Sequence, residues 1–261
     1  DGEDLRVIDA LTGEDVQAPR EFASVTNIVV TGRDNSDDTL ILDFATGAII
    51  PAGGIDYDGG DNGNDGLQLD NGVFTAITHN FIDGSSGSVD LDGLTITYSD
   101  LEPIADNLAA TNRDFNFSPS DDTVTIGDSG APGDGLSQIS STGTSESVTF
   151  ASPSSAVSVN LGAGNDAIVV TDLDSTFTGT FNVSSQSGED TIDGSGATTN
   201  LILNGGDDND VVTGGTGDDN ISGGNGDDLL DGGPGIDNVD GGAGFDTVRD
   251  QVSGMAIITD T

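Results

Sequence analysis

The feature that most constrains this chain is a nine-residue unit repeated five times without interruption over residues 205–249. The copies read GGDDNDVVT, GGTGDDNIS, GGNGDDLLD, GGPGIDNVD and GGAGFDTVR. Each begins with Gly-Gly, has Asp at its sixth place and an aliphatic residue at its eighth, and only the first departs at the fourth place, with Asp208 instead of Gly. A flexible Gly/Asp linker would have no reason to keep an aliphatic residue at the same place of every copy. The pattern therefore predicts folded units that stack on one another.

The glycines and aspartates at fixed places favour cation binding. Glycine tolerates positive φ, which lets a tight loop turn its carbonyl oxygens toward one point, and Asp is the shortest side chain with a carboxylate. Calcium takes six to eight oxygens at about 2.3–2.6 Å, more than one unit supplies. We therefore expect successive units to alternate between the two edges of a flattened coil, so that loops eighteen residues apart share an ion. The eighth-place aliphatic residues would then form a thin core.

The composition supports the same interpretation. Forty-seven acidic residues face five basic ones, and only six of the acidic residues are Glu. Short acidic side chains in glycine-rich turns suit metal loops. The net charge of −42 argues against nucleic acid and anionic membrane as direct partners, since both need basic surfaces. The chain has no cysteine, which excludes disulfides and thiolate metal sites, and no apolar run approaches the roughly eighteen residues of a membrane span.

Upstream of residue 205 the same signature recurs in diluted form. SQSGEDTID (185–193) and LGAGNDAIV (161–169) keep Asp and an aliphatic residue in register, and alternating runs such as VSVNL (157–161) predict strands with one face inward. We expect an all-β, elongated parallel β-solenoid (β-helix) ending in a calcium-bound β-roll. Its predicted parts are an irregular β-rich part over 1–110, a long-coil part over 111–204, the roll over 205–249 and a capping strand over 250–261.

Two local features of the upstream region carry expectations of their own. SDLE (99–102) has the capping-box pattern, and Pro103 is compatible with the first turn of a helix. We expect at most one or two helical turns there, and a joint between an N-terminal and a C-terminal part of the chain over 101–118. The single histidine, His79 in ITHNF, is expected on the surface of a strand.

Residues 205–249 resemble the RTX, or haemolysin-type, calcium-binding repeats of secreted bacterial toxins, proteases, lipases and adhesins. In that family the carbonyls at places two and four and the Asp of one repeat combine with the carbonyls at places one and three and the Asp two repeats later. The resemblance implies Ca²⁺ as the cofactor. The implied sets are Gly206, Asp208, Asp210, Gly223, Asn225 and Asp228; Gly215, Gly217, Asp219, Gly232, Pro234 and Asp237; and Gly224, Gly226, Asp228, Gly241, Ala243 and Asp246. A fourth site would pair Asp190 with Asp210.

The resemblance also implies secretion, and the upstream region is similar to β-rich segments of giant secreted bacterial surface proteins. Two functions follow. The first is a non-enzymatic structural or adhesive module of an extracellular assembly, which associates end to end or contacts cell-surface glycans. The alternative is a calcium-dependent β-helix enzyme acting on polysaccharide, which a groove lined by Arg113 or Arg33 with clustered carboxylates would favour. Ice binding needs outward rows of Thr or Asn, and the third and fifth places of the repeats form no such row.

The sequence is poor in groups that carry out catalysis. It has one His, no Cys and no Lys. A zinc protease needs a histidine pair, and a serine hydrolase needs a base beside its nucleophile. Enzymes that act on acidic polysaccharides use Arg or Lys to neutralise the uronate, and a strongly negative surface repels such a chain. We therefore expect no enzyme activity.

Overall fold

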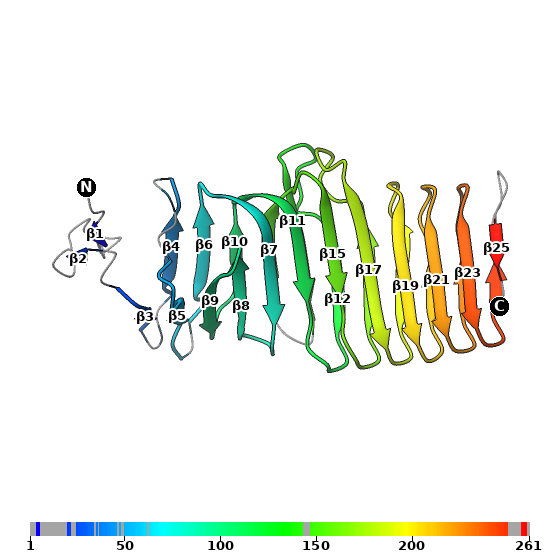
Figure 1. Cartoon of the computed structure of the whole chain (residues 1–261), viewed down its shortest axis with the longest axis horizontal. Coiled ribbons are helices and arrows are strands. Elements are labelled where there is room, and N and C mark those ends of the chain that lie inside the picture. Colours follow the sequence, from blue (N-terminus) through cyan, green and yellow to red (C-terminus); the bar gives the residue numbers. More distant parts are fainter. Residues whose placement is uncertain are drawn as a thin grey trace.

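The chain forms an elongated, two-sheeted β-solenoid (Figure 1). The computed structural model describes residues 25–249, apart from 34, 36, 46, 48, 49, 62 and 143–146, together with the short strands β1 (Asp4–Leu5), β2 (Arg20–Glu21) and β25 (Ile257–Thr259). Within these residues the regular structure is all strand, with no helix. The predicted fold class is confirmed.

Two long sheets contain every strand except the β1–β2 pair. Sheet I has twelve strands, in the order β25, β23 (Asn238–Ala243), β21 (Asn220–Asn225), β19 (Leu201–Asp207), β17 (Thr180–Ser187), β15 (Ala156–Asn160), β11 (Ala109–Asn116), β7 (Val73–Phe81), β8 (Gly87–Leu91), β9 (Leu94–Ser99), β5 (Ile55–Asp58) and β3 (Ile28–Thr31). Sheet II has eleven, in the order β24 (Thr247–Arg249), β22 (Leu229–Asp231), β20 (Val211–Thr213), β18 (Thr191–Gly196), β16 (Ala167–Thr171), β12 (Thr123–Asp128), β13 (Leu136–Ser141), β14 (Ser147–Ala151), β10 (Ile104–Asp106), β6 (Gly66–Asp70) and β4 (Thr39–Asp43).

The C-terminal repeats form the most regular part of the solenoid. Strands β19, β21 and β23 pair in parallel in sheet I, and β20, β22 and β24 do the same in sheet II. Successive repeats therefore alternate between the two sheets, as the repeat length predicts. The eighth-place residues Val212, Ile221, Leu230 and Val239 are all buried, and Val248 is partly buried. One aliphatic side chain per repeat gives this part a thin core.

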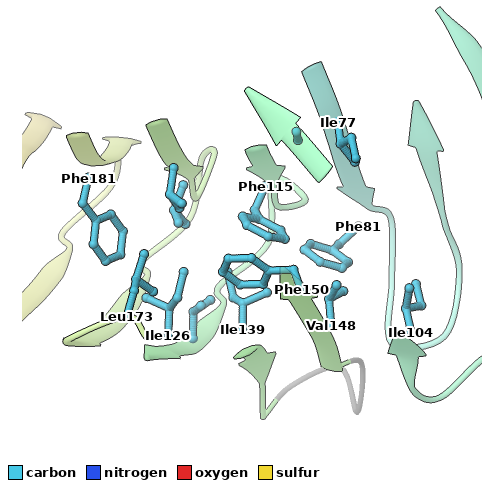
Figure 2. Close-up of a cluster of buried hydrophobic side chains, with 14 of the residues drawn as sticks. Ile77, Phe81, Ile104, Phe115, Ile126, Ile139, Val148, Phe150, Leu173 and Phe181 are labelled. Atoms are coloured by element: carbon cyan, nitrogen blue, oxygen red, sulfur yellow. The ribbon is translucent and has the colours of Figure 1, made fainter. Parts of the chain in front are cut away.

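Upstream, the coils are longer and the sheets include two antiparallel strands. Strand β8 runs antiparallel between β7 and β9, and β13 runs antiparallel between β12 and β14. Each of them adds one strand to its sheet between two strands of opposite direction. This part of the chain holds the cluster of buried hydrophobic side chains shown in Figure 2. In it, the ring centroids of Phe115 and Phe150 are 4.9 Å apart. Most of the hydrophobic burial in the described chain is therefore upstream of the repeats.

No helical turn follows Ser99, where at most one or two were expected. Strand β9 ends at Ser99, and the chain continues through β10 and β11. Leu101 and Ile104 are fully buried, because their side chains enter the coil interior. Strand β10 pairs with β6 and β14, and β11 pairs with β7 and β15. The two sheets thus run without a break across the expected joint at 101–118.

His79 is buried, so its expected place on the surface of a strand was wrong. Its Nε2 lies 3.0 Å from Oδ2 of Asp106, and the same oxygen accepts a hydrogen bond from the guanidinium of Arg113. All three side chains are fully buried. Arg113 also donates through Nε to the Ala151 carbonyl oxygen at 2.8 Å. The three polar residues form a buried cluster, which we call the His–Asp–Arg cluster.

Candidate metal centre

Six aspartates form a column along one edge of the solenoid. Each lies immediately before a strand of sheet II: Asp122, Asp166, Asp190, Asp210, Asp228 and Asp246. In every neighbouring pair, Oδ1 of the later aspartate accepts a hydrogen bond from the backbone N–H of the earlier one, at 2.7 to 3.0 Å. The sequence separations along the column are 44, 24, 20, 18 and 18 residues. We refer to this set as the aspartate column.

The second carboxylate oxygen of each column member has no hydrogen-bond donor. All six Oδ2 atoms are buried and unpaired. Buried polar atoms normally have a partner, and an isolated buried charge is strongly unfavourable. A row of such oxygens therefore needs a positive charge nearby, or protons.

The loops around the column direct backbone carbonyls toward the neighbouring loop. In the repeats at this edge, places two and four have positive φ, as at Gly224 (φ 117) and Gly226 (φ 142). A Cβ at either position would overlap a carbonyl oxygen, that of Gly206 or of Asp208. Asp208, the one non-glycine at a fourth place, also has positive φ, at 75°. The glycines therefore allow the close approach that brings carbonyl oxygens and carboxylates together.

The opposite edge of the solenoid has a shorter column of two aspartates. Oδ1 of Asp237 accepts the Asp219 N–H at 2.9 Å, and Oδ1 of Asp219 accepts the Leu201 N–H at 2.8 Å. Asp237 is buried, and Oδ2 of Asp219 accepts the Gly215 N–H at 2.6 Å. Because Leu201 stands where a further aspartate would be needed, this edge offers one pair of carboxylates.

The structure brings the predicted ligand sets together in pairs of neighbouring loops. Gly206, Asp208 and Asp210 lie in one loop, and Gly223, Asn225 and Asp228 lie in the loop paired with it in parallel. Gly224, Gly226 and Asp228 lie likewise beside Gly241, Ala243 and Asp246. On the other edge, Gly215, Gly217 and Asp219 lie beside Gly232, Pro234 and Asp237. Asp190 lies next to Asp210 in the column. The individual ligand roles stay predictions.

The sequence reasoning missed a second set of loop residues, at the fifth place of the repeats. Side chains of Asn209, Asp218 and Asp227 each accept the backbone N–H of the fifth-place residue eighteen positions later. The sixth-place aspartates bond in the opposite direction along the solenoid. Each loop is thereby tied to both of its neighbours. The available signal was the Asn or Asp at the fifth place of the first three copies.

Burial keeps several of these carboxyls from ionising easily. It raises the pKa of Asp210 to about 7, and neighbouring carboxylates add to the rise. Burial also raises the pKa of Asp166 and of Asp219 to about 6. The pKa values of three further members of the aspartate column are raised for the same main reason: Asp122, Asp190 and Asp228. Such carboxyls gain most from a bound cation, which stabilises their charged form.

The donor set fits calcium. It consists of carboxylate and backbone carbonyl oxygens, with no nitrogen or sulfur, and hard cations such as Ca²⁺ take six to eight oxygen ligands of this kind. The unpaired Oδ2 atoms of Asp210, Asp228 and Asp246, and the buried carboxylates of Asp219 and Asp237 on the opposite edge, supply the negative charge. Each pair of neighbouring loops at these positions joins two carboxylates with carbonyls of both loops.

Comparison with known protein families agrees with this geometry. The family model for the RTX calcium-binding nonapeptide repeat matches four copies, over residues 204–239 and 231–249. Residues 204–249 are RTX calcium-binding nonapeptide repeats. The RTX repeats bind calcium, and such repeats are typical of secreted bacterial proteins. Comparisons with curated proteins and with solved structures gave no match. None of the described residues forms a helix long and apolar enough to cross a membrane.

The raised pKa values predict that pH acts in opposite directions with and without calcium. The calcium-free folded chain binds more protons than the unfolded chain between about pH 4 and pH 7, so its free energy of unfolding should fall as the pH rises through this range. Calcium binds the deprotonated carboxylates, so its affinity should rise over the same range. In chelator, the RTX repeats should therefore give more β-signal in circular dichroism at about pH 5 than at about pH 7.5, and in saturating calcium their thermal midpoint should rise between the same two pH values.

Two variants separate this effect from general charge repulsion. Asp210→Asn should flatten the calcium-free pH dependence, because it removes a carboxyl whose pKa is raised to about 7. Asp193→Asn removes a carboxylate from strand β18 and should leave the dependence unchanged. A β-signal in chelator that does not fall between about pH 5 and about pH 7.5 would contradict the interpretation.

Proposed function

We propose that this chain is a secreted, non-enzymatic structural or adhesive module of an extracellular assembly, stabilised by calcium. The observation that carries the proposal is the continuity of the two sheets. Both run from the strands β3 and β4 to β24 and β25, and calcium-binding loops follow their edges in the last coils. A long, rigid body of this kind suits a load-bearing or spacing role. Cell-surface glycans are candidate partners for an adhesive role.

The positions of the basic residues support the non-enzymatic interpretation. Arg113 is fully buried in the His–Asp–Arg cluster, so its guanidinium is not available to an anionic polysaccharide. The side chain of Arg33 pairs with Asp38 at 2.7 Å. An open depression of about 280 Å³ lies over β3, β5 and β9, and its described lining includes Asp56 and Asp58 but no arginine. A uronate would therefore meet negative charge there.

The edges of the sheets offer a way to assemble end to end. Among the described strands, β3 pairs only with β5, and β25 only with β23. The Ile28 N–H donates to Gly54 and the Gly32 N–H to Asp58, so by alternation the N–H of Val29 faces away from β5. Open strand edges are templates for another chain. Lateral association would instead press together surfaces of a chain with net charge −42.

A single proline tests this mode of assembly. Val29→Pro removes the outward N–H of β3 without breaking a bond to β5, since proline is tolerated on edge strands. Light scattering in millimolar calcium should show the wild-type mass rising with protein concentration, and electron microscopy should show thin, unbranched filaments. Val29→Pro should weaken both, and Val29→Ala, which keeps the N–H, should not. A strictly monomeric wild type at high concentration would contradict the proposal.

A further inference from the structure

We propose that the series of calcium sites extends upstream of the RTX repeats, to a site between the loops 161–166 and 185–190. Its carboxylates are those of Asp166 and Asp190. The family match begins at residue 204, so both loops lie outside it. The inference is independent of end-to-end assembly, because it concerns ion binding within one chain.

The main observation is a pair of buried oxygens without partners. Asp166 and Asp190 are each 2% exposed. Their Oδ1 atoms accept the backbone N–H groups of Asp122 at 2.8 Å and of Asp166 at 2.7 Å. Their Oδ2 atoms are buried and accept no hydrogen bond. The Ser185 hydroxyl has one proton, which it donates to the Gly205 carbonyl oxygen at 2.6 Å.

The backbone around these oxygens has the same conformation as in the repeats. Places two and four of the first loop, Gly162 and Gly164, have φ values of 102° and 129°. The Gly164 N–H donates to the Ser187 carbonyl oxygen at 3.0 Å, as the Gly226 N–H donates to Ala243 at 2.8 Å. The two loops are also joined in parallel by a bridge from Ala163 to Ser187. Carbonyl oxygens therefore supplement the two carboxylates, in an all-oxygen set that suits calcium.

The second loop departs from the residue pattern of the repeats, although it keeps their backbone conformation. Residues 185–187 read Ser-Gln-Ser where a repeat has Gly-Gly-x. Gln186 nevertheless has a positive φ of 72°, and Gly188 has 129°. The loop thus keeps the backbone of a repeat while losing its residue pattern.

The loop before Asp166 differs from the loops that would hold calcium. In the preceding loop, 117–122, no residue has positive φ, although the structure describes all of them. Its carbonyls are therefore not presented as in the repeats, even though Asp122 belongs to the aspartate column. We limit the inference to the site of Asp166 and Asp190.

The test counts calcium ions on the intact chain. Native mass spectrometry at saturating calcium should show one ion fewer on Asp166→Asn than on the wild type. The variant keeps the oxygen that accepts the Asp122 N–H, so the coil should stay folded, and hydrogen exchange in β16 checks this. Asp193→Asn, in the next coil, removes one carboxylate outside the aspartate column and should bind as many ions as the wild type.

Three outcomes would overturn the inference. The first is an unchanged ion count for Asp166→Asn. The second is an equal loss for Asp193→Asn, which would mean that the ion is a surface counterion. The third is loss of every ion, which would give Asp166 a general role in folding.

Discussion

Removal of calcium should unfold residues 204–249 while the coils of β7, β11 and β15 stay folded. Each RTX repeat buries one aliphatic side chain, such as Ile221 or Leu230, whereas the upstream coils bury Phe115, Phe150 and Phe181. Neighbouring strands lie about 4.8 Å apart, so the stacked carboxylates repel one another when no cation is bound. Calcium therefore contributes a larger share of the stability in the repeats than in the upstream coils.

Several ions must act together to give this effect. Extracellular modules bind calcium with dissociation constants of about 10⁻⁴–10⁻³ M, so at about 1 mM calcium one site adds only about 0.4–1.4 kcal/mol. Because Asp228 lies in two predicted sites and each loop is bonded to its neighbours, filling one site favours the next. The gain of structure on adding calcium should therefore be cooperative.

Hydrogen exchange on the full chain is the direct measurement. In chelator at about pH 7.5, amides of β20, β22 and β24 should exchange as in an unfolded chain, and those of β11 and β15 should stay protected. Circular dichroism should lose β-signal and regain it over a narrow range of calcium concentration. Magnesium should not substitute, because it requires near-ideal octahedral geometry. A spectrum and a protection pattern that do not change in chelator would refute the prediction.

The repeats could be predicted almost completely from the sequence, and the reason is their constant length. With nine residues in every unit, spacing alone fixes which residues are neighbours, so the eighteen-residue offset of Asp210 and Asp228 follows directly. Upstream, neighbouring members of the aspartate column are 20, 24 and 44 residues apart. The antiparallel strand β13 lies within the longest of these separations, as an insertion between Asp122 and Asp166. No local sequence pattern predicts that the aspartate column continues across this insertion.

The burial of His79 could have been predicted from the alternation of residues along its strand. Ile77, His79 and Phe81 alternate along β7, and all three face the core. The alternation of Arg113 with Phe115 along β11 gives the same signal. The alternation along each strand therefore indicates that His79 and Arg113 are buried, whereas charged residues are usually exposed. Only the pairing of β7 with β11, and the approach of Asp106 from sheet II, shows what balances the charge.

Asp106→Ala should destabilise the upstream coils by about 3–5 kcal/mol, since it leaves a guanidinium buried without its counterion. Burial by itself would raise the pKa of Asp106, but Arg113 and His79 outweigh it and hold the pKa below its usual value. The carboxylate is therefore the charged partner of the cluster. Urea unfolding at saturating calcium, followed by hydrogen exchange in β7 and β11, isolates this effect from that of the repeats.

A double variant tests whether the lost stability comes from the unpaired charge. Asp106→Val with Arg113→Met removes both charges while keeping the site filled, and apolar replacement of a buried ion pair is often neutral. Here recovery should be only partial, because the carbonyl oxygens of Leu108 and Ala151 lose their Arg113 donors. The double variant should thus lie between the wild type and Asp106→Ala. A loss below about 1 kcal/mol for Asp106→Ala would show that the pair contributes no more than an exposed one.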